Sequence, residues 1–123
     1  RLLMNTHSNV EIAETWLAAF NAQDLEKLLS LYHEEAKHYS PKLKERQPET
    51  QGLIQGKNAL REWWQDAFTR LPSLHYKAIS ITADDEHVWM EYMRSVVGER
   101  DMMVAEVLDI ANGQIVSSRV YHG

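Results

Sequence analysis

One carboxylate interrupts an apolar segment near the end of the chain. Residues 101–110 read DMMVAEVLDI, an alternation typical of a β-strand in which every second side chain points to the same face. The residues that share a face with Glu106 are all apolar: Met102, Val104, Leu108 and Ile110. An unpaired carboxylate is costly to bury, so Glu106 is expected to be protonated, paired or partly hydrated.

The preceding segment supplies candidate partners for this acid. Residues 87–97 also alternate, and a turn at 98–101, GERD, pairs the two segments as a hairpin. Four side chains of that segment then share the face of Glu106: Val88, Met90, Tyr92 and Arg94. In this pairing Tyr92 lies almost opposite Glu106, and Arg94 lies one diagonal step away. Arg94 either forms an ion pair with Glu106 or joins it in binding a polar ligand group.

The last strand of the chain allows two registers. A two-residue turn at 112–113, Asn-Gly, places Arg119 and Tyr121 beside Glu106, where Arg119 is a second candidate for an ion pair. A three-residue loop shifts the pairing by one residue, which moves every side chain to the other face. The residues on the face of Glu106 are then Val116, Ser118, Val120 and His122.

Two histidines complete the candidate catalytic set. His38 precedes Ser40 by two residues in the short extended segment AKHYS, so the two share a face. Because histidine titrates near neutral pH, His38 and His122 are suited to accept a proton while Glu106 polarises or protonates a ligand oxygen. The structural alternatives are a satisfied or surface His38 and an exposed His122 beside the C-terminus. The three residue types could ligate a metal, but no local pair such as HxxxH supports this, so no metal and no other cofactor are expected.

Composition excludes several classes of protein. The 123 residues predict one domain, 1–123, and a net charge of -5 disfavours binding to a nucleic-acid backbone. The absence of cysteine excludes disulfides, thiolate metal sites and thiol nucleophiles. No apolar run approaches the ~20 residues of a membrane helix, and the N-terminus lacks the pattern of a signal peptide. We therefore expect a cytoplasmic protein without nucleic-acid or membrane partners.

The first half of the chain predicts helices. Ser8 and Glu11 form a capping box, which predicts that the first helix starts there. Apolar residues follow at helical spacing: Ile12, Ala13, Trp16, Leu17 and Phe20. Asp24 then caps a short second helix, which carries Tyr32 near its end.

The middle of the chain predicts a loop, a third helix and then a change of period. Residues 41–56 are polar, with two prolines and two glycines, and predict a loop long enough to serve as a lid or binding segment. A third helix runs from about residue 57 to 71, where Pro72 ends it. From Leu74 the apolar period changes from 3.6 to 2, which predicts consecutive antiparallel strands and an α+β fold.

Three stretches together resemble the NTF2-like superfamily, in particular its SnoaL-like and ketosteroid-isomerase-like branch. They read AAFNAQDLEKLLSLYHEEAKHYSP, QGKNAL and EVLDIANGQIVSSRVYHG, and the resemblance covers nearly the whole chain. It implies a cone in which three N-terminal helices pack on a curved antiparallel β-sheet and enclose a pocket. The resemblance does not define a function, because this fold carries isomerases, cyclases, hydrolases and association domains.

The resemblance also implies a role for Glu106 and shows that two other catalytic positions of ketosteroid isomerases are not matched. Glu106 corresponds to the protonated aspartate that donates a hydrogen bond to the substrate oxyanion of ketosteroid isomerases. The general base corresponds to Ser40 and the oxyanion-binding tyrosine to Trp16, and neither can act as a carboxylate base. Isomerisation by that mechanism is therefore not expected. The resemblance places His122 at a pocket-lining aromatic position, which favours the register of the three-residue loop.

These observations leave more than one function open. The first is an enzyme that performs acid–base chemistry, such as isomerisation, cyclisation or hydrolysis, on a small apolar or carbonyl-containing molecule. The alternatives are a non-catalytic ligand-binding protein and a dimerising association module. The residues expected to contact the ligand are Trp16, Tyr32, Ser40, Trp64, Met90, Tyr92, Arg94, Val104, Ser118 and Val120.

The opposite face of the predicted sheet is apolar as well. Its residues on strict alternation are Ile79, Ile81, Trp89, Met93, Met103, Ala105, Val107, Ile115 and Tyr121. Such a face is too apolar to remain solvated, and no further helix is available to cover it. We expect a homodimer that packs through this outer sheet face.

Overall fold

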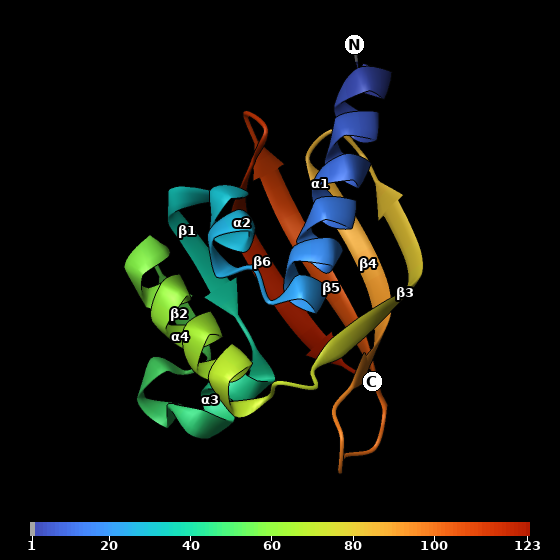
Figure 1. Ribbon diagram of the computed structural model, residues 1–123. Helices are drawn as coiled ribbons and strands as arrows, with labels where there is room; N and C mark the ends of the chain where they lie inside the picture. The colour runs from blue at the N-terminus through green and yellow to red at the C-terminus, as the bar shows by residue number, and fades with distance from the viewer. Residues whose placement is uncertain (1) are drawn as a thin grey trace.

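A strongly curved six-stranded sheet forms one layer of the protein, and helices cover its concave side (Figure 1). The structure is a computed structural model that describes the backbone of residues 2–123 and the side chains of residues 8–123. The strands are β1 (Tyr32–Tyr39), β2 (Leu53–Gln55), β3 (His75–Ala83), β4 (His87–Ser95), β5 (Met102–Ala111) and β6 (Gln114–His122). The helices are α1 (Leu2–Ala22), α2 (Leu25–Ser30), α3 (Pro41–Arg46) and α4 (Lys57–Arg70), with a 3-10 helix, η1 (Pro48–Thr50).

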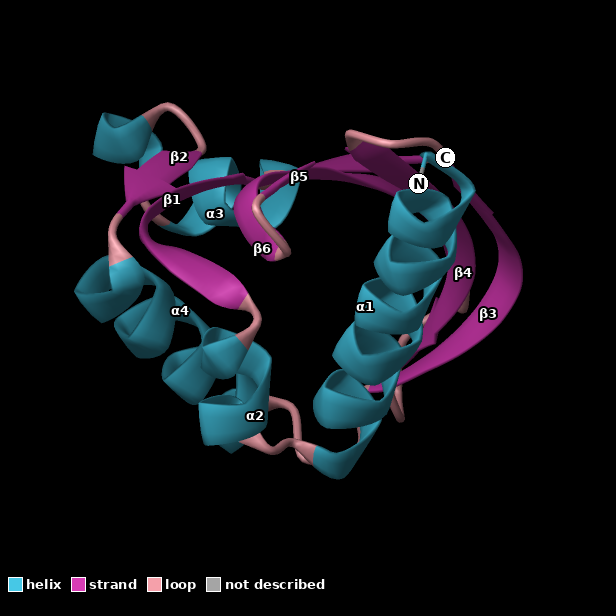
Figure 2. Cartoon of the chain, turned by 90° about the horizontal axis from the view of Figure 1, so that it is seen from above, coloured by secondary structure: helices cyan, strands magenta, loops and turns pink. Residues whose placement is uncertain are grey.

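The predicted α+β fold is confirmed, and the sheet differs from the prediction in one pairing. The strand order is β2-β1-β6-β5-β4-β3, and β1 runs parallel to β6 while the other neighbours are antiparallel. The sheet is therefore mixed rather than wholly antiparallel. Seen from above, it curves around α1, α2 and α4 without closing into a barrel (Figure 2).

The first helix starts elsewhere than predicted. α1 begins at Leu2, so Ser8 and Glu11 lie within the helix and the capping-box prediction is wrong. A Ser-x-x-Glu pattern marks a helix start only where no helical turn precedes it, and here the helix continues upstream. The Asp24 cap is confirmed, because its side chain accepts a hydrogen bond from the backbone N–H of Lys27 at 3.1 Å.

The segment after α2 is more regular than predicted. Tyr32 begins β1 instead of belonging to the second helix, which ends two residues earlier. The prediction of a loop over 41–56 is also wrong, because this segment forms α3, η1 and β2. Ser40 caps α3 by accepting a hydrogen bond from the N–H of Lys42, and Pro41 occupies the first helical position. Each of these elements has three to six residues, too few for an apolar period to show in the sequence.

The third predicted helix and the antiparallel strands are confirmed as α4 and β3 to β6, but one register differs. Met90 lies opposite Glu106, and Tyr92 lies opposite Val104, so the predicted pairing of Tyr92 with Glu106 is two residues out. The cause is the connection, since residues 96–101 lie between the two strands where a four-residue turn was expected. Because the shift is even, the face assignment of the strand is unchanged.

The hairpin of β5 and β6 combines features of both predicted registers. The turn has two residues, Asn112 and Gly113, with φ of 52° and 76°, the left-handed conformations of a type I′ turn. A bulge then leaves Val116 without a partner, because Ile110 pairs with Ile115 while the preceding residue pairs with Ser117. The extra residue turns Ser118, Val120 and His122 to the face of Glu106, as the second register predicted. Ile115 takes the buried position that the prediction gave to Val116.

A cluster of aromatic rings joins the helices to the sheet. The ring of Phe20 lies 4.4 Å from Trp16, 5.8 Å from Trp64, 5.5 Å from Phe68 and 4.9 Å from Tyr76, measured between ring centroids. These contacts connect α1 with α4 and β3. Aromatic pairs at such distances contribute ~0.5–1.5 kcal/mol beyond the burial of their surface. The cluster therefore fixes the helices over the concave face of the sheet.

The outer face of the sheet is apolar, although two predicted members are absent from it. Ile81 packs against the core because β3 has an irregularity between Ala78 and Ser80, and Ile115 is buried because of the bulge in β6. Four large side chains on four strands remain 43–50% exposed: Ile79, Trp89, Met103 and Tyr121.

Candidate functional site

A cavity of about 240 Å³ opens between the helices and the concave face of the sheet. Its wall includes residues of α3, of the end of α4, of β4 and of the end of β6, which lie at the lower end of the molecule in Figure 1. Nine of the residues expected from the sequence to form the site line it: His38, Ser40, Trp64, Tyr92, Arg94, Val104, Glu106, Val120 and His122.

Four expected ligand contacts lie behind the wall instead of in it. Trp16, Tyr32, Met90 and Ser118 are at most 1% exposed and do not line the cavity. They share the inward orientation that the sequence indicated, but they belong to a deeper layer that sequence alternation cannot separate from the wall.

Sequence reasoning missed Tyr76 as a wall residue. It lies on β3 opposite Arg94, and its ring stacks on that of Tyr92 with a centroid distance of 4.2 Å. The alternation of the predicted strand from residue 74 already placed Tyr76 on the inner face, so this signal was present. The cavity-lining residues of α3 could not be found, because that helix was predicted to be a loop.

The carboxyl group of Glu106 is enclosed in this wall with half of its hydrogen-bonding capacity unused. The residue is 2% exposed, and its Oε1 accepts a hydrogen bond from the Tyr92 hydroxyl at 2.7 Å. Oε2 is buried without a partner among the described residues. Burial raises the pKa of Glu106 to about 8, and the hydrogen bond from Tyr92 lowers it only in part. Glu106 is therefore neutral at pH 7, and with Oε1 accepting from Tyr92 its proton lies on Oε2.

Neither arginine suggested by the sequence forms an ion pair with Glu106. Arg94 Nη1 lies 2.8 Å from Glu99 Oε1, in the connection between β4 and β5. Arg119 instead pairs with Asp109 on the neighbouring strand. No cation in the described structure therefore opposes the effect of burial on Glu106, which explains why this acid keeps its proton.

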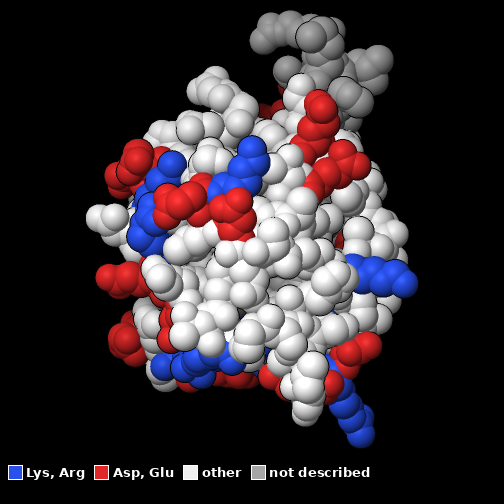
Figure 3. Space-filling model, viewed as in Figure 1, with Lys and Arg blue, Asp and Glu red and all other residues white. Residues whose placement is uncertain are grey.

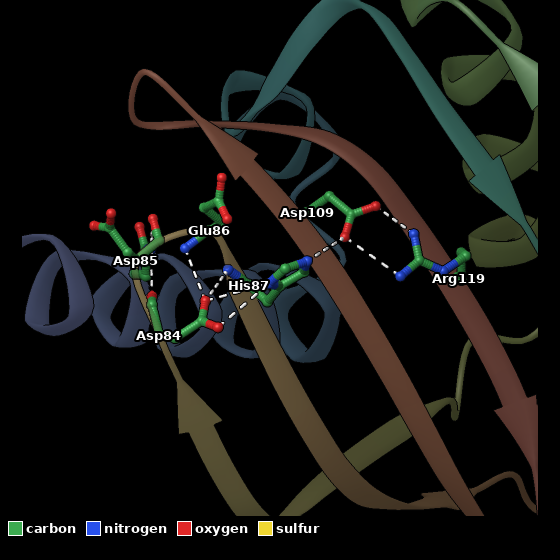
Figure 4. Close-up of polar contacts among 7 residues, drawn as sticks. Asp84, Asp85, Glu86, His87, Asp109 and Arg119 are labelled. Atoms are coloured by element: carbon green, nitrogen blue, oxygen red, sulfur yellow. Dashed lines mark hydrogen bonds and ion pairs between the residues drawn. The ribbon is translucent and has the colours of Figure 1, made fainter.

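Arg119 belongs to a polar network outside the cavity (Figure 4). Asp84 accepts hydrogen bonds from the backbone N–H groups of Glu86 and His87, and its carboxylate lies 3.2 Å from His87 Nδ1. His87 Nε2 lies 3.7 Å from Asp109, which in turn binds Arg119. The network ties the turn between β3 and β4 to β5 and β6. In the described part of the chain no group of three or more His, Cys, Asp or Glu residues is placed to hold a metal.

A chain of buried hydrogen bonds ends at His38. Trp16 Nε1 lies 3.0 Å from the Tyr32 hydroxyl, which lies 3.0 Å from Ser118 Oγ, which lies 2.7 Å from His38 Nδ1. The indole N–H can only donate, so the Tyr32 hydroxyl accepts from it, and each of the two buried hydroxyls has one hydrogen to donate along the chain. Tyr32 donates to Ser118, and Ser118 donates to the ring nitrogen of His38.

This direction fixes the tautomer of His38. Burial lowers the pKa of His38 to about 3, so the ring is neutral at pH 7 and carries one N–H. Because Nδ1 accepts from Ser118, the proton lies on Nε2. The ring lines the cavity, and Nε2 has no protein partner among the described residues. His38 therefore presents a hydrogen-bond donor to the cavity and not a basic lone pair.

His122 differs from His38 in its surroundings. It lines the cavity at the end of β6, remains partly exposed and lies beside Val104 in the sheet. Burial lowers the pKa of His122, and the nearby charges of Lys42 and Arg94 lower it further. The ring is consequently neutral at pH 7 and can accept a proton from a bound molecule.

Comparison with known proteins assigns the fold to a family. A SnoaL-like domain profile matches residues 13–118, so the chain belongs to the SnoaL-like family, as the sequence resemblance predicted. No curated protein matches the chain in sequence.

Solved structures share the fold at low sequence identity. A SnoaL-like protein of unknown function from Burkholderia thailandensis has 24% identity and a TM-score of 0.86, with 95% of each chain covered. A Kribbella flavida protein provisionally described as a ketosteroid isomerase has 14% identity and a TM-score of 0.80, covering 97% of this chain and 80% of its own. A Sinorhizobium meliloti protein provisionally described as a polyketide cyclase has 16% identity and a TM-score of 0.76, with 90% and 94% covered. At these identities the likeness establishes the fold alone.

The pKa values of Glu106 and His38 imply opposite contributions to stability as the pH rises. Glu106 keeps its proton in the folded state up to about pH 8 but loses it near pH 4.5 when unfolded, so its contribution falls across that window. His38 takes up a proton near pH 6.5 when unfolded but only near pH 3 when folded, so its contribution rises between those values. Above pH 6.5, Glu106 acts alone of the two.

We predict that the wild-type protein loses free energy of unfolding relative to Glu106→Gln as the pH rises from 6.5 to about 8. The amide cannot ionise, and it can still accept a hydrogen bond from Tyr92. The difference between the two proteins should change by up to ~1.4 kcal/mol per pH unit in urea denaturation. A difference that stays constant across this window would contradict a neutral, buried Glu106.

We also predict that Ser118→Ala destabilises the protein by ~1–3 kcal/mol, because the Tyr32 hydroxyl and His38 Nδ1 then lack a partner. Ser117→Ala, on the other face of β6, is the matched control and should have little effect. Nitrogen NMR of the wild-type ring should show a protonated Nε2 and a bare Nδ1 at neutral pH. A proton on Nδ1 would contradict the inferred donation from Ser118 to His38.

Proposed function

We propose that the protein binds a small, mostly apolar molecule in this cavity and contacts its carbonyl or similar oxygen with the neutral carboxyl group of Glu106. The observation that carries the proposal is the buried Oε2, which has no partner in the described protein and belongs to a wall residue. An enclosed donor without an acceptor is costly, and a ligand oxygen would satisfy it. The volume of about 240 Å³ lies below the ~300–1,000 Å³ of drug-sized sites, which favours a small ligand.

His38 supports the same proposal as a second donor in the cavity wall. Its ring is held by the hydrogen bond from Ser118 and by contact with Trp64 at 5.1 Å between ring centroids. Donors that are fixed before a ligand arrives lose little freedom when it binds, and their hydrogen bonds are strong in an apolar surrounding. Glu106 and His38 together would polarise an oxygen without placing a charge in the cavity.

His122 is the proton acceptor in the catalytic form of the proposal. It is the wall histidine whose nitrogens are both free of protein partners in the described structure, whereas Nδ1 of His38 is occupied. The resulting chemistry is an acid–base reaction such as isomerisation, cyclisation or hydrolysis. The provisional descriptions of two structural neighbours as an isomerase and a cyclase support this range. The alternative is ligand binding without turnover.

The two other ketosteroid-isomerase positions have structural roles in this protein. The Ser40 hydroxyl accepts a hydrogen bond from the N–H of Lys42 at the start of α3. Trp16 donates its indole N–H to Tyr32 behind the cavity wall. These contacts support a reaction other than dienol isomerisation with a carboxylate base at those positions.

A second copy of the chain is the partner that we propose for the outer sheet face. The four exposed side chains Ile79, Trp89, Met103 and Tyr121 span β3 to β6, and large exposed apolar patches are uncommon on monomers. The absence of nucleic-acid partners and a cytoplasmic location remain expectations from charge and composition. None of the described helices is long and apolar enough to cross a membrane.

Ligand binding can be tested by thermal shift with small ketones and lactones. We predict that a binding ketone raises the Tm of wild type, raises that of Glu106→Gln in part, and has no effect on Glu106→Leu. A ligand at 100 times its Kd stabilises the folded state by ~2.7 kcal/mol. Glu62→Leu, which removes an exposed carboxylate of α4 outside the cavity, is the matched control and should respond as wild type does. An equal response of Glu106→Leu and wild type would show that Glu106 does not contact the ligand.

The outer-face interface can be tested by sedimentation. We predict that Trp89→Asp and Val107→Asp shift the protein from dimer to monomer, because each would bury a carboxylate in an apolar interface. Leu53→Asp changes a residue that is 47% exposed on β2, at the opposite edge of the sheet, and should leave the dimer intact. Dimers that persist in both outer-face variants would place the interface elsewhere.

A further inference from the structure

The cavity wall contains a buried permanent charge that the proposed contact with a carbonyl oxygen does not use. Arg94 is 8% exposed and lines the cavity together with Glu106. It lies on β4 four residues beyond Met90, the residue opposite Glu106. At ~3.3 Å per residue, the backbone positions of Met90 and Arg94 are ~13 Å apart along β4. Arg94 therefore marks one end of the cavity and Glu106 a deeper position.

The guanidinium group has more donors than the protein uses. Arginine carries five N–H groups, and Glu99 accepts a hydrogen bond from Nη1 at 2.8 Å. No other side chain of the described structure accepts a hydrogen bond from Arg94. Among the described residues, Glu106 Oε2 is the side-chain atom that is both fully enclosed and without a partner. The unused nitrogens of Arg94 are therefore not fully enclosed and are open to the cavity or its solvent.

The pairing of Arg94 with Glu99 is unequal. The side chain of Arg94 is 9% exposed, whereas that of Glu99 is 43% exposed. A buried charge needs more compensation than one partly hydrated acid in a single contact supplies. An anion inside the cavity could take up the remaining donors in the bidentate geometry that arginine favours.

A second cation lies at the same end of the cavity. Lys42 of α3 lines the wall and forms no ion pair within the described residues. Lys42 and Arg94 both lower the pKa of His122 by more than Glu45 raises it, so positive charge dominates around that ring. Figure 3 shows Lys and Arg side chains gathered with acidic ones at the lower end of this face, over α3.

Two further arginines of the wall are more exposed than Arg94 and share one carboxylate. Arg70 lies 2.7 Å from Asp66 and Arg46 lies 4.0 Å from the same carboxylate. Arg94 is therefore the wall arginine that depends most on a partner inside the cavity, and Lys42 is the cation beside it without an ion pair among the described residues.

We infer that the ligand is an oxo acid, whose carboxylate binds Arg94 and Lys42 at the open end of the cavity while its carbonyl oxygen reaches Glu106. This inference rests on the proposed function for the carbonyl end of the ligand, and it adds that the other end of the ligand is a carboxylate. It gives the site a direction, because a molecule with one acidic end and one neutral oxygen can bind in a single orientation.

The test compares unbranched methyl-ketone acids, from 4-oxopentanoate to 8-oxononanoate, with their methyl esters by titration calorimetry. At the best chain length the acid should bind wild type at least tenfold more tightly than its ester. Arg94→Gln should lose this preference, and Arg94→Lys should keep part of it. Glu99→Gln should keep or increase it, since it frees a donor of Arg94. Arg61→Gln, which removes an arginine paired with Glu26 outside the cavity, should match wild type.

Each other outcome has a distinct meaning. Equal affinity for acid and ester, with both lost in Glu106→Leu, would overturn the oxo-acid inference and leave the proposed function intact. An affinity for the acid that falls in Arg94→Gln but is unchanged in Glu106→Leu would support the carboxylate site and overturn the role of Glu106. Equal loss of the preference in Arg94→Gln and Glu99→Gln would reduce Arg94 to a structural partner of Glu99. Absence of binding by every acid and ester would overturn both proposals.

Discussion

Polar groups on the concave face of the sheet have little access to water, so each of them needs a partner inside the protein or inside the cavity. The helices and the aromatic cluster around Phe20 enclose this face, which makes an unpaired group expensive. Trp16, Tyr32, Ser118 and His38 meet this constraint by forming one directed chain of hydrogen bonds. Within the described residues, the buried atom left over is Glu106 Oε2. The buried polar atom that lacks a hydrogen-bond partner in the described protein therefore belongs to a residue of the cavity wall.

The same constraint makes a buried acid and a buried histidine neutral, although their chemistry is opposite. Burial raises the pKa of Glu106 to about 8 and lowers that of His38 to about 3. Both residues line the cavity, and each then carries a hydrogen without a partner in the described protein, on Oε2 of Glu106 and on Nε2 of His38. A site built in this way favours a ligand that gains negative charge on an oxygen, because its donors are already oriented and add no charge of their own.

The parts of the fold that could be predicted are those with long periodic segments. The helix α4 and the strands β3 to β6 follow from an apolar period over nine or more residues, and the Asp24 cap follows from local side-chain chemistry. The capping box at Ser8 failed because a local motif does not reveal whether a helix already precedes it. The segment 41–56 failed because its short elements are stabilised by neighbours far away in sequence, such as the pairing of β2 with β1. The separation of wall residues such as Tyr92 from deeper ones such as Met90 depends on how the layers pack in space, which periodicity does not encode.

The candidate site depends most closely on one residue that no periodic pattern identifies. Without the bulge at Val116, the two-residue turn at Asn112 and Gly113 would direct Arg119 and Tyr121 toward Glu106. A cation beside Glu106 would favour its ionised form and remove the reason for its raised pKa. The extra residue instead places Ser118 where it can direct the His38 ring, and leaves Arg119 to bind Asp109 on the outer face. The neutral character of the cavity is therefore set by the register of a strand as much as by the residues in its wall.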